Sequence, residues 1–127
     1  MEERFSIINK TREKLPSLFF VKTKNDILGK RYSLSIAYVS ENESREINKK
    51  YRKKNRPTNI LSFALHKNKG EIVLCPAVIR QEAKNFGKTF SQFLGFLVIH
   101  GMLHLKGLEH GKEMGEAEKK YLSRIKF

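Results

Sequence analysis

The sequence predicts an α+β or α/β domain in which a small mixed β-sheet packs against helices. Segments patterned as strands and segments patterned as helices follow one another along the chain, which favours a sheet covered by helices. The helical segment around residues 93–99 is apolar on all sides, as is typical of a helix buried in a core. The length of 127 residues suits one hydrophobic core, so we expect residues 1–127 to form a single domain.

Two strands are predicted in the N-terminal third. Residues 4–8 are rich in β-branched and aromatic side chains and predict the first strand. Residues 11–28 leave helix and irregular structure both open, because Pro16 interrupts a run of helix-forming residues. Residues 32–39 alternate between polar and apolar side chains, which predicts a strand with one buried face.

A helix and two paired strands are predicted next. Ser40 and Glu43 have the spacing of a capping box, so we expect a helix to begin there and to reach about Lys53. Residues 58–65 and 71–74 have the composition of strands and are joined by a short polar turn. So tight a connection predicts that the two strands are antiparallel neighbours.

The C-terminal half is predicted to be mainly helical. Pro76 suits the first turn of a helix that we expect to last until about Gly87. Thr89 and Gln92 have a second capping-box pattern, which begins the apolar central helix. Residues 112–127 predict a basic terminal helix or tail.

Three of the four histidines lie within eleven residues at the end of the central helix. His100 and His104 are four residues apart, which offsets them on a helix by about 40° and about 6 Å, so both can reach one metal ion. Gly107 favours a helix stop, after which the chain can turn back and bring His110 to the same ion. Two histidines at this spacing also arise by chance as core residues, but a third one after a glycine stop favours a metal site.

The histidine spacing matches that of zincin proteases with a third downstream histidine, H-E-x-x-H-x-x-G-x-x-H, at all positions but one. Gly101 stands where those proteases have the glutamate that acts as general base. Three histidine ligands leave a fourth tetrahedral position open for water, which is typical of a catalytic zinc site. The pattern therefore predicts a buried central helix that carries two metal ligands, followed by a third.

The chain is strongly basic, with 26 Lys and Arg against 13 Asp and Glu and a formal net charge of +13. Such a charge attracts polyanions, and nucleic acid is the first candidate. An anionic membrane fits less well, because no predicted helix combines a basic face with a broad apolar one.

Six of the eight residues 49–56 are basic, and an aromatic residue, Tyr51, lies among them. Cations at the end of a helix are favoured by the helix dipole, but six exceed what that interaction needs. The run therefore predicts a phosphate-binding surface on which Tyr51 can stack. The residues expected to contact phosphates are Lys49, Lys50, Lys53, Lys54 and Arg56.

Three further features predict a cytoplasmic protein without a membrane contact. Cys75 is the single cysteine, which rules out an internal disulfide and fits a reducing compartment. The first residues are partly acidic and lack an apolar leader. The apolar run 93–99 is far shorter than the roughly 20 residues that span a bilayer.

Two longer motifs and one short motif resemble those of the YbeY endoribonucleases. Residues 100–110, His-Gly-Met-Leu-His-Leu-Lys-Gly-Leu-Glu-His, resemble the signature H-G-x-L-H-L-x-G-y-D-H. Residues 48–63 resemble N-x-x-Y-R-x-x-x-x-P-T-N/D-V-L-S-F, and residues 70–72 resemble G-D-I. The chain departs from the family at Glu71 and Glu109, where aspartate is usual, and at Leu108, where an aromatic residue is common.

The resemblance implies a zinc-dependent, single-strand-specific endoribonuclease that acts in 16S rRNA 3′-end maturation and ribosome quality control. It implies one Zn²⁺ per chain, held by His100, His104 and His110, and a catalytic role for Arg52 beside the metal. The implied partners are the 16S rRNA precursor and the small ribosomal subunit, and no DNA is expected. Whether water or the RNA 2′-hydroxyl attacks stays open.

Two alternative functions stay open from the residues. A metal-dependent hydrolase of a peptide or a small phosphoester keeps the histidine site but leaves the charge of +13 unexplained. A non-catalytic zinc-containing ribosome-binding protein keeps the charge but requires a fourth protein ligand. The candidates for that ligand are His66, Cys75 and Glu109.

Overall fold

A four-stranded mixed sheet forms the centre of the computed structural model, which describes residues 4–15 and 20–125. The strand order is β1-β2-β4-β3. β2 pairs in parallel with both β1 and β4, whereas β3 pairs with β4 in antiparallel fashion, so the predicted mixed sheet and the predicted hairpin are confirmed. The strands are β1 (Phe5–Asn9), β2 (Ser33–Tyr38), β3 (Ile60–His66) and β4 (Lys69–Leu74).

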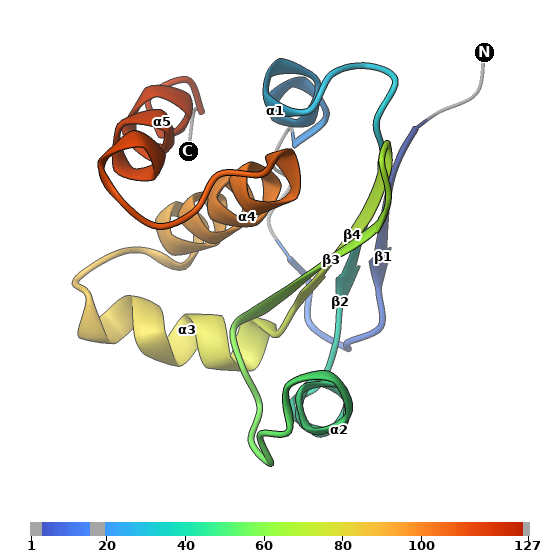
Figure 1. Cartoon of the computed structure of the whole chain (residues 1–127). Coiled ribbons are helices and arrows are strands. Elements are labelled where there is room, and N and C mark those ends of the chain that lie inside the picture. The colour runs from blue at the N-terminus through green and yellow to red at the C-terminus, as the bar shows by residue number, and fades with distance from the viewer. Residues whose placement is uncertain (1–3, 16–19, 126–127) are drawn as a thin grey trace.

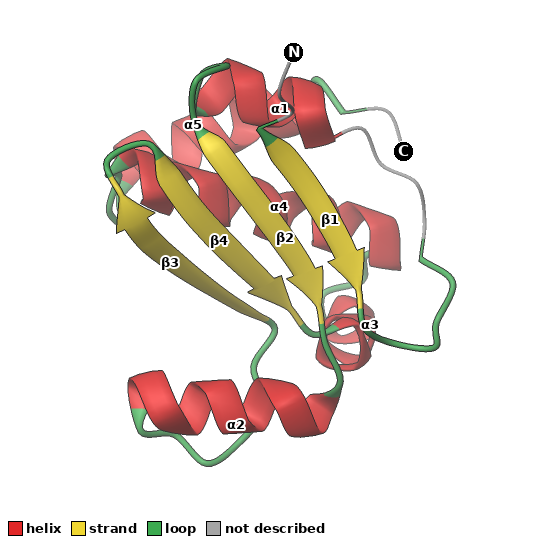
Figure 2. Cartoon of the chain, turned by 90° about the vertical axis from the view of Figure 1, so that its right-hand side faces the viewer, coloured by secondary structure: helices red, strands yellow, loops and turns green. Residues whose placement is uncertain are grey.

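In the part of the chain that the structure describes, five helices accompany this sheet, and the α+β fold class is confirmed. Four of them, α1, α3, α4 and α5, lie on one side of the sheet, and α2 lies apart from them beyond one end of the strands (Figure 1). Figure 2 shows the face of the sheet opposite to α1, α3, α4 and α5, with β1 and β3 at its two edges. The helices are α1 (Phe20–Ile27), α2 (Glu41–Arg52), α3 (Pro76–Asn85), α4 (Phe90–Lys106) and α5 (Lys112–Leu122).

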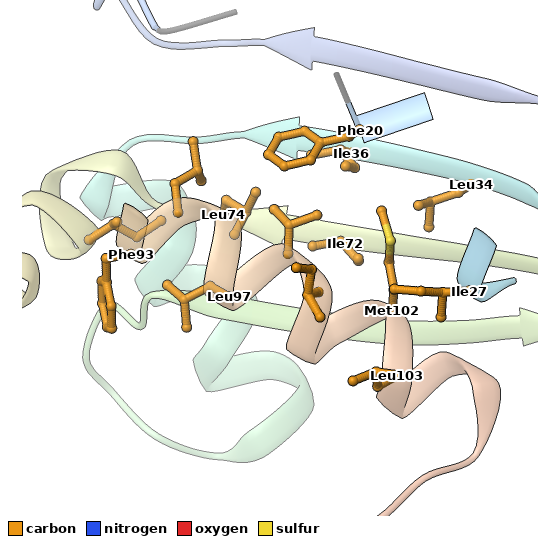
Figure 3. Close-up of a cluster of buried hydrophobic side chains, with 14 of the residues drawn as sticks. Phe20, Ile27, Leu34, Ile36, Ile72, Leu74, Phe93, Leu97, Met102 and Leu103 are labelled. Carbon is orange, nitrogen blue, oxygen red and sulfur yellow. The ribbon is translucent and has the colours of Figure 1, made fainter. Parts of the chain in front are cut away.

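The hydrophobic core lies between the sheet and α4. The alternation in β2 turns Leu34, Ile36 and Tyr38 toward the helices, and all three are buried. Figure 3 shows Leu97 and Met102 of α4 among the apolar side chains of β2 and β4. The predicted burial of the central helix is therefore confirmed, and burial on this scale holds α4 rigidly against the sheet.

The ends of the helices follow the predicted capping signals with one difference. At α4 the capping box is complete, because Thr89 and Gln92 each accept a hydrogen bond from the other's backbone N–H. At α2 the side chain of Ser40 accepts from the N–H of Glu43, but the Glu43 carboxylate accepts from Lys10 Nζ at 3.1 Å instead of closing the box. Lys53, the predicted last residue of α2, is its left-handed cap with φ 57°.

The undecided N-terminal segment contains one helix in its described part, α1, whereas Pro16 lies outside the described residues. The terminal segment forms the helix α5. In residues 4–15 and 20–125, no helix combines the length and the apolar character that crossing a membrane requires.

Candidate metal centre

Helix α4 places two of the three clustered histidines on one face. The Nε2 atoms of His100 and His104 are 3.0 Å apart, and the centroids of the two rings are 4.5 Å apart. The predicted helical spacing therefore brings both imidazoles to one point, at the C-terminal end of a helix that the core holds in place.

A glycine stop returns the chain to this point. Gly107 has φ 111°, and the N–H of Leu108 donates to the carbonyl of Leu103 at 3.0 Å, the hydrogen bond of a Schellman motif. The ring of His110 then lies 5.2 Å from that of His100. Each of the three histidines offers a nitrogen within 4.8 Å of the others, so the group can hold one metal ion.

A carboxylate that sequence reasoning missed orients one of these histidines. Oε2 of Glu118, on α5, accepts a hydrogen bond from Nδ1 of His100 at 2.6 Å, and both side chains are largely buried. The proton on Nδ1 leaves the lone pair of Nε2 free to face the other two histidines. A signal for it exists, because Met114, Glu118 and Tyr121 follow helical spacing and place the carboxylate on the apolar stripe of α5.

The protonation state of His104 suits a ligand role. Burial, followed by the neighbouring His100 and His110, lowers the pKa of His104 below its ordinary value. A neutral imidazole is the form that binds metals, so this environment favours the ligand form before any ion arrives.

The donor set fits a metal centre with three protein ligands. Three imidazole nitrogens supported by a carboxylate are typical ligands of zinc and of neighbouring transition metals. Within residues 4–15 and 20–125, the group of metal-competent side chains contains His100, His104 and His110. The candidates for a fourth ligand lie outside it, and they are His66, Cys75 and Glu109. The arrangement therefore leaves a coordination position for solvent or substrate.

The three histidines line a cavity of about 730 Å³ together with residues from α2 and β3. Arg52, the last residue of α2, lies in this lining, so the structure brings it to the same cavity as the histidines. The other predicted basic contacts are exposed and lie outside the lining. The remaining lining residues are Tyr51, Thr58, Asn59, Ile60, Leu61, Ser62 and Phe63.

Two buried polar residues of α2 hold the basic loop that carries the chain from Arg52 to β3. Ser44 Oγ accepts from the N–H of Thr58 at 2.9 Å and donates to the carbonyl of Thr58 at 3.0 Å. Asn48 Nδ2 donates to the carbonyl of Arg56 at 2.8 Å. Ser44 and Asn48 are each only 1% exposed, so these hydrogen bonds fix the loop and the start of β3.

The packing around Gly101 explains why this position does not carry the glutamate of the protease motif. A Cβ at this position would come within 2.9 Å of Ile60 Cδ1 and of Ser62 Oγ, because α4 lies close against β3 here. A glutamate would have to enter this contact, and the side chains of Ile60 and Ser62 would have to move aside to admit it. The arrangement therefore supplies no equivalent of the protease general base at this position.

The two acidic residues at positions of family aspartates lie away from the histidine group. Gly70 and Ile72 are both buried, so the alternation of β4 places Glu71 on the opposite face of the sheet from the core. Glu109 is exposed.

Comparison with known proteins identifies the family. A family model described as Endoribonuclease YbeY matches residues 3–126. An Endoribonuclease YbeY of Thermotoga maritima is 39% identical over 100 residues, which cover 72% of this chain and 67% of that protein. One of Staphylococcus carnosus is 32% identical over 118 residues, which cover 84% and 77%. The solution structure of a Thermotoga maritima protein matches with a TM-score of 0.66 and 31% identity, and covers 94% of this chain and 87% of the other. The chain therefore belongs to the YbeY endoribonuclease family.

Proposed function

We propose that this protein is a zinc-dependent endoribonuclease that cleaves single-stranded RNA. We further propose that it acts in the cytoplasm on the 3′ end of the 16S rRNA precursor, bound to the small ribosomal subunit, in rRNA maturation and ribosome quality control. The observation that carries the proposal is one cavity in which three metal-competent histidines and Arg52 lie together, in a chain with a net charge of +13.

The proposed roles follow from the chemistry of each group. His100, His104 and His110 would hold the ion, and a zinc ion bound there supplies Lewis acidity toward a phosphoryl oxygen and an attacking oxygen. The guanidinium of Arg52 would bind the scissile phosphate through two parallel hydrogen bonds and stabilise the negative charge that develops in the transition state.

RNA is favoured over a peptide by charge and by sterics. A polyanion is attracted by the field of this chain, whereas a neutral peptide gains nothing from it. Gly101 is packed against β3, so the site offers no carboxylate at the position of the protease base. RNA is favoured over DNA because the relatives are named endoribonucleases.

The test adds the zinc-loaded protein to a 16S rRNA precursor that retains its 3′ extension and, separately, to a peptide library. The expected result is cleavage of the RNA alone, with no RNA cleavage by a His104→Ala variant prepared in the same way. That variant also identifies contaminating nucleases, which would cleave in its presence. His66→Ala serves as a matched control, because His66 is exposed and outside the histidine group.

Two results would contradict the proposal. Cleavage of peptides without cleavage of RNA would favour a metal-dependent hydrolase of another substrate. Salt-sensitive binding of RNA without cleavage under any divalent metal would favour a non-catalytic ribosome-binding protein.

A further inference from the structure

An exposed aromatic side chain lines the same cavity as the histidines. Tyr51, in the last turn of α2, is 60% exposed although its ring is large and apolar. Phe63 of β3 contacts it edge to face, with ring centroids 5.1 Å apart and an angle of 63° between the planes. Both residues belong to the lining of the cavity.

The Tyr51 ring is held in position before any substrate binds. Phe63 supports it from the sheet, and Lys50 Nζ lies 5.3 Å from its centroid. The helix beneath it is fixed to the following loop through the buried side chains of Ser44 and Asn48. A preorganised ring loses little conformational entropy when a flat ligand stacks on it.

The wall beside this ring is an open strand edge. The N–H of Cys75 donates to the carbonyl of Asn59 at 3.0 Å, so these two residues form a hydrogen-bonded pair at the start of the β3–β4 ladder. Hydrogen-bonded and non-hydrogen-bonded residue pairs alternate along an antiparallel ladder. The backbone N–H and C=O groups of Ile60 and Ser62 therefore point away from β4. β3 is an edge strand, and these groups therefore face the open side, where they can hydrogen-bond to a base or a ribose (Figure 2).

From these contacts we infer that Tyr51, supported by Phe63, is a nucleobase-stacking subsite beside the metal centre, and that this subsite makes the enzyme select single-stranded RNA. The inference rests on the proposed function and adds a specificity determinant to it. An unpaired base has a free face to stack on an aromatic ring, whereas both faces of a base inside a duplex are already covered. A stacking platform also accepts any of the four bases, since each has a flat π-face.

The test measures binding to zinc-loaded protein with a short 2′-O-methyl phosphorothioate oligouridylate, which resists cleavage. Tyr51→Ala should weaken binding of the single strand by roughly tenfold or more. Tyr51→Phe should bind as the wild type does, because stacking needs the ring and not the hydroxyl. Phe86→Ala is the matched control, since Phe86 is an aromatic residue 65% exposed and lies outside the cavity lining.

A second arm couples the tyrosine to one base. An abasic site is moved along the oligonucleotide, and at one position it should weaken binding to the wild type while leaving binding to Tyr51→Ala unchanged. A duplex of the same length should bind both proteins equally. With RNA that can be cleaved, Tyr51→Ala should raise KM by a larger factor than it lowers kcat.

The outcomes separate this inference from the proposed function. If the wild type cleaves RNA, but Tyr51→Ala binds equally well and no abasic position distinguishes the two proteins, the stacking subsite is wrong while the nuclease stands. An equal loss of affinity for single strands and duplexes would also overturn it. If the wild type cleaves no RNA, the proposed function itself fails. Unchanged zinc content and thermal unfolding of Tyr51→Ala exclude a folding defect.

Discussion

Glu118 of α5 accepts a hydrogen bond of 2.6 Å from Nδ1 of His100 on α4, across 18 residues of sequence. The contact joins the terminal helix to the metal centre, so α5 is part of the site and not only a cover for the core. A carboxylate in this position fixes the tautomer and the ring orientation of a histidine ligand and raises its basicity.

Glu118→Gln should therefore weaken zinc binding by roughly 10-fold to 100-fold, because the amide is neutral and a poorer acceptor for the imidazole proton. Competition with a chromophoric chelator measures the dissociation constant. Glu116→Gln is the matched control, since Glu116 is exposed on the same helix. Equal zinc affinity of the two variants would show that the hydrogen bond does not support the ligand.

The parts of the site that the sequence predicted are local in the chain. His100, His104 and His110 are related by one helical turn and one glycine stop, and both features follow from the geometry of a few residues. The strand hairpin was predictable for the same reason, because β3 and β4 are adjacent in sequence and joined by a tight turn.

The parts that the sequence did not reveal depend on packing between distant segments. The carboxylate of Glu118 meets His100 only because α5 packs against α4, and periodicity within α5 does not specify that partner. The strand order leaves β3 at an edge, which follows from the parallel pairing of β2 with β4 and not from any local pattern. Ser44 likewise reaches Thr58 through the tertiary fold.

Arg52→Ala should lower kcat/KM for single-stranded RNA by roughly two to three orders of magnitude, because charge stabilisation in a transition state is worth a few kcal/mol. Zinc content and the free energy of unfolding should stay close to those of the wild type, since Arg52 is exposed. Arg52→Lys should restore only part of the activity, because an ammonium group cannot bind a phosphate with a planar fork.

Arg45→Ala is the matched control for this series, because Arg45 is an exposed arginine of the same helix and lies outside both the basic run 49–56 and the cavity lining. Equal turnover by Arg52→Ala and the wild type would show that Arg52 is only a cation at the end of a helix.

Gly101→Glu introduces the glutamate that the protease motif carries at this position and tests whether the packing of α4 on β3 can accommodate it. The new side chain would enter the contact between α4 and β3, so the free energy of unfolding should fall by about 3 kcal/mol or more. Urea unfolding followed by circular dichroism measures this change. No peptidase activity should appear.

The same substitution at Gly115 provides the control. Gly115 lies in α5, and a Cβ there would meet no heavy atom within 4 Å, so Gly115→Glu should be neutral or stabilising through higher helix propensity. If Gly101→Glu proved as stable as Gly115→Glu, the close packing of α4 on β3 would not be the reason for the glycine.

The exposed lysines that follow Arg52 should set the salt dependence of RNA binding. Lys53 and Lys54 directly follow Arg52, which lines the cavity, and both are exposed, so we expect their ammonium groups to contact phosphates of a bound RNA. On a plot of log affinity against log salt, each phosphate contact contributes about 0.7 to the slope for a single strand. Lys53→Ala and Lys54→Ala should each flatten the slope by about that amount and weaken binding to all sequences alike.

Lys84→Ala is the matched control and should leave the slope unchanged, because Lys84 is an exposed lysine on α3 outside the cavity lining. A slope equally reduced by all three substitutions would mean that the net charge of +13 attracts RNA as a whole, without phosphate contacts at this loop.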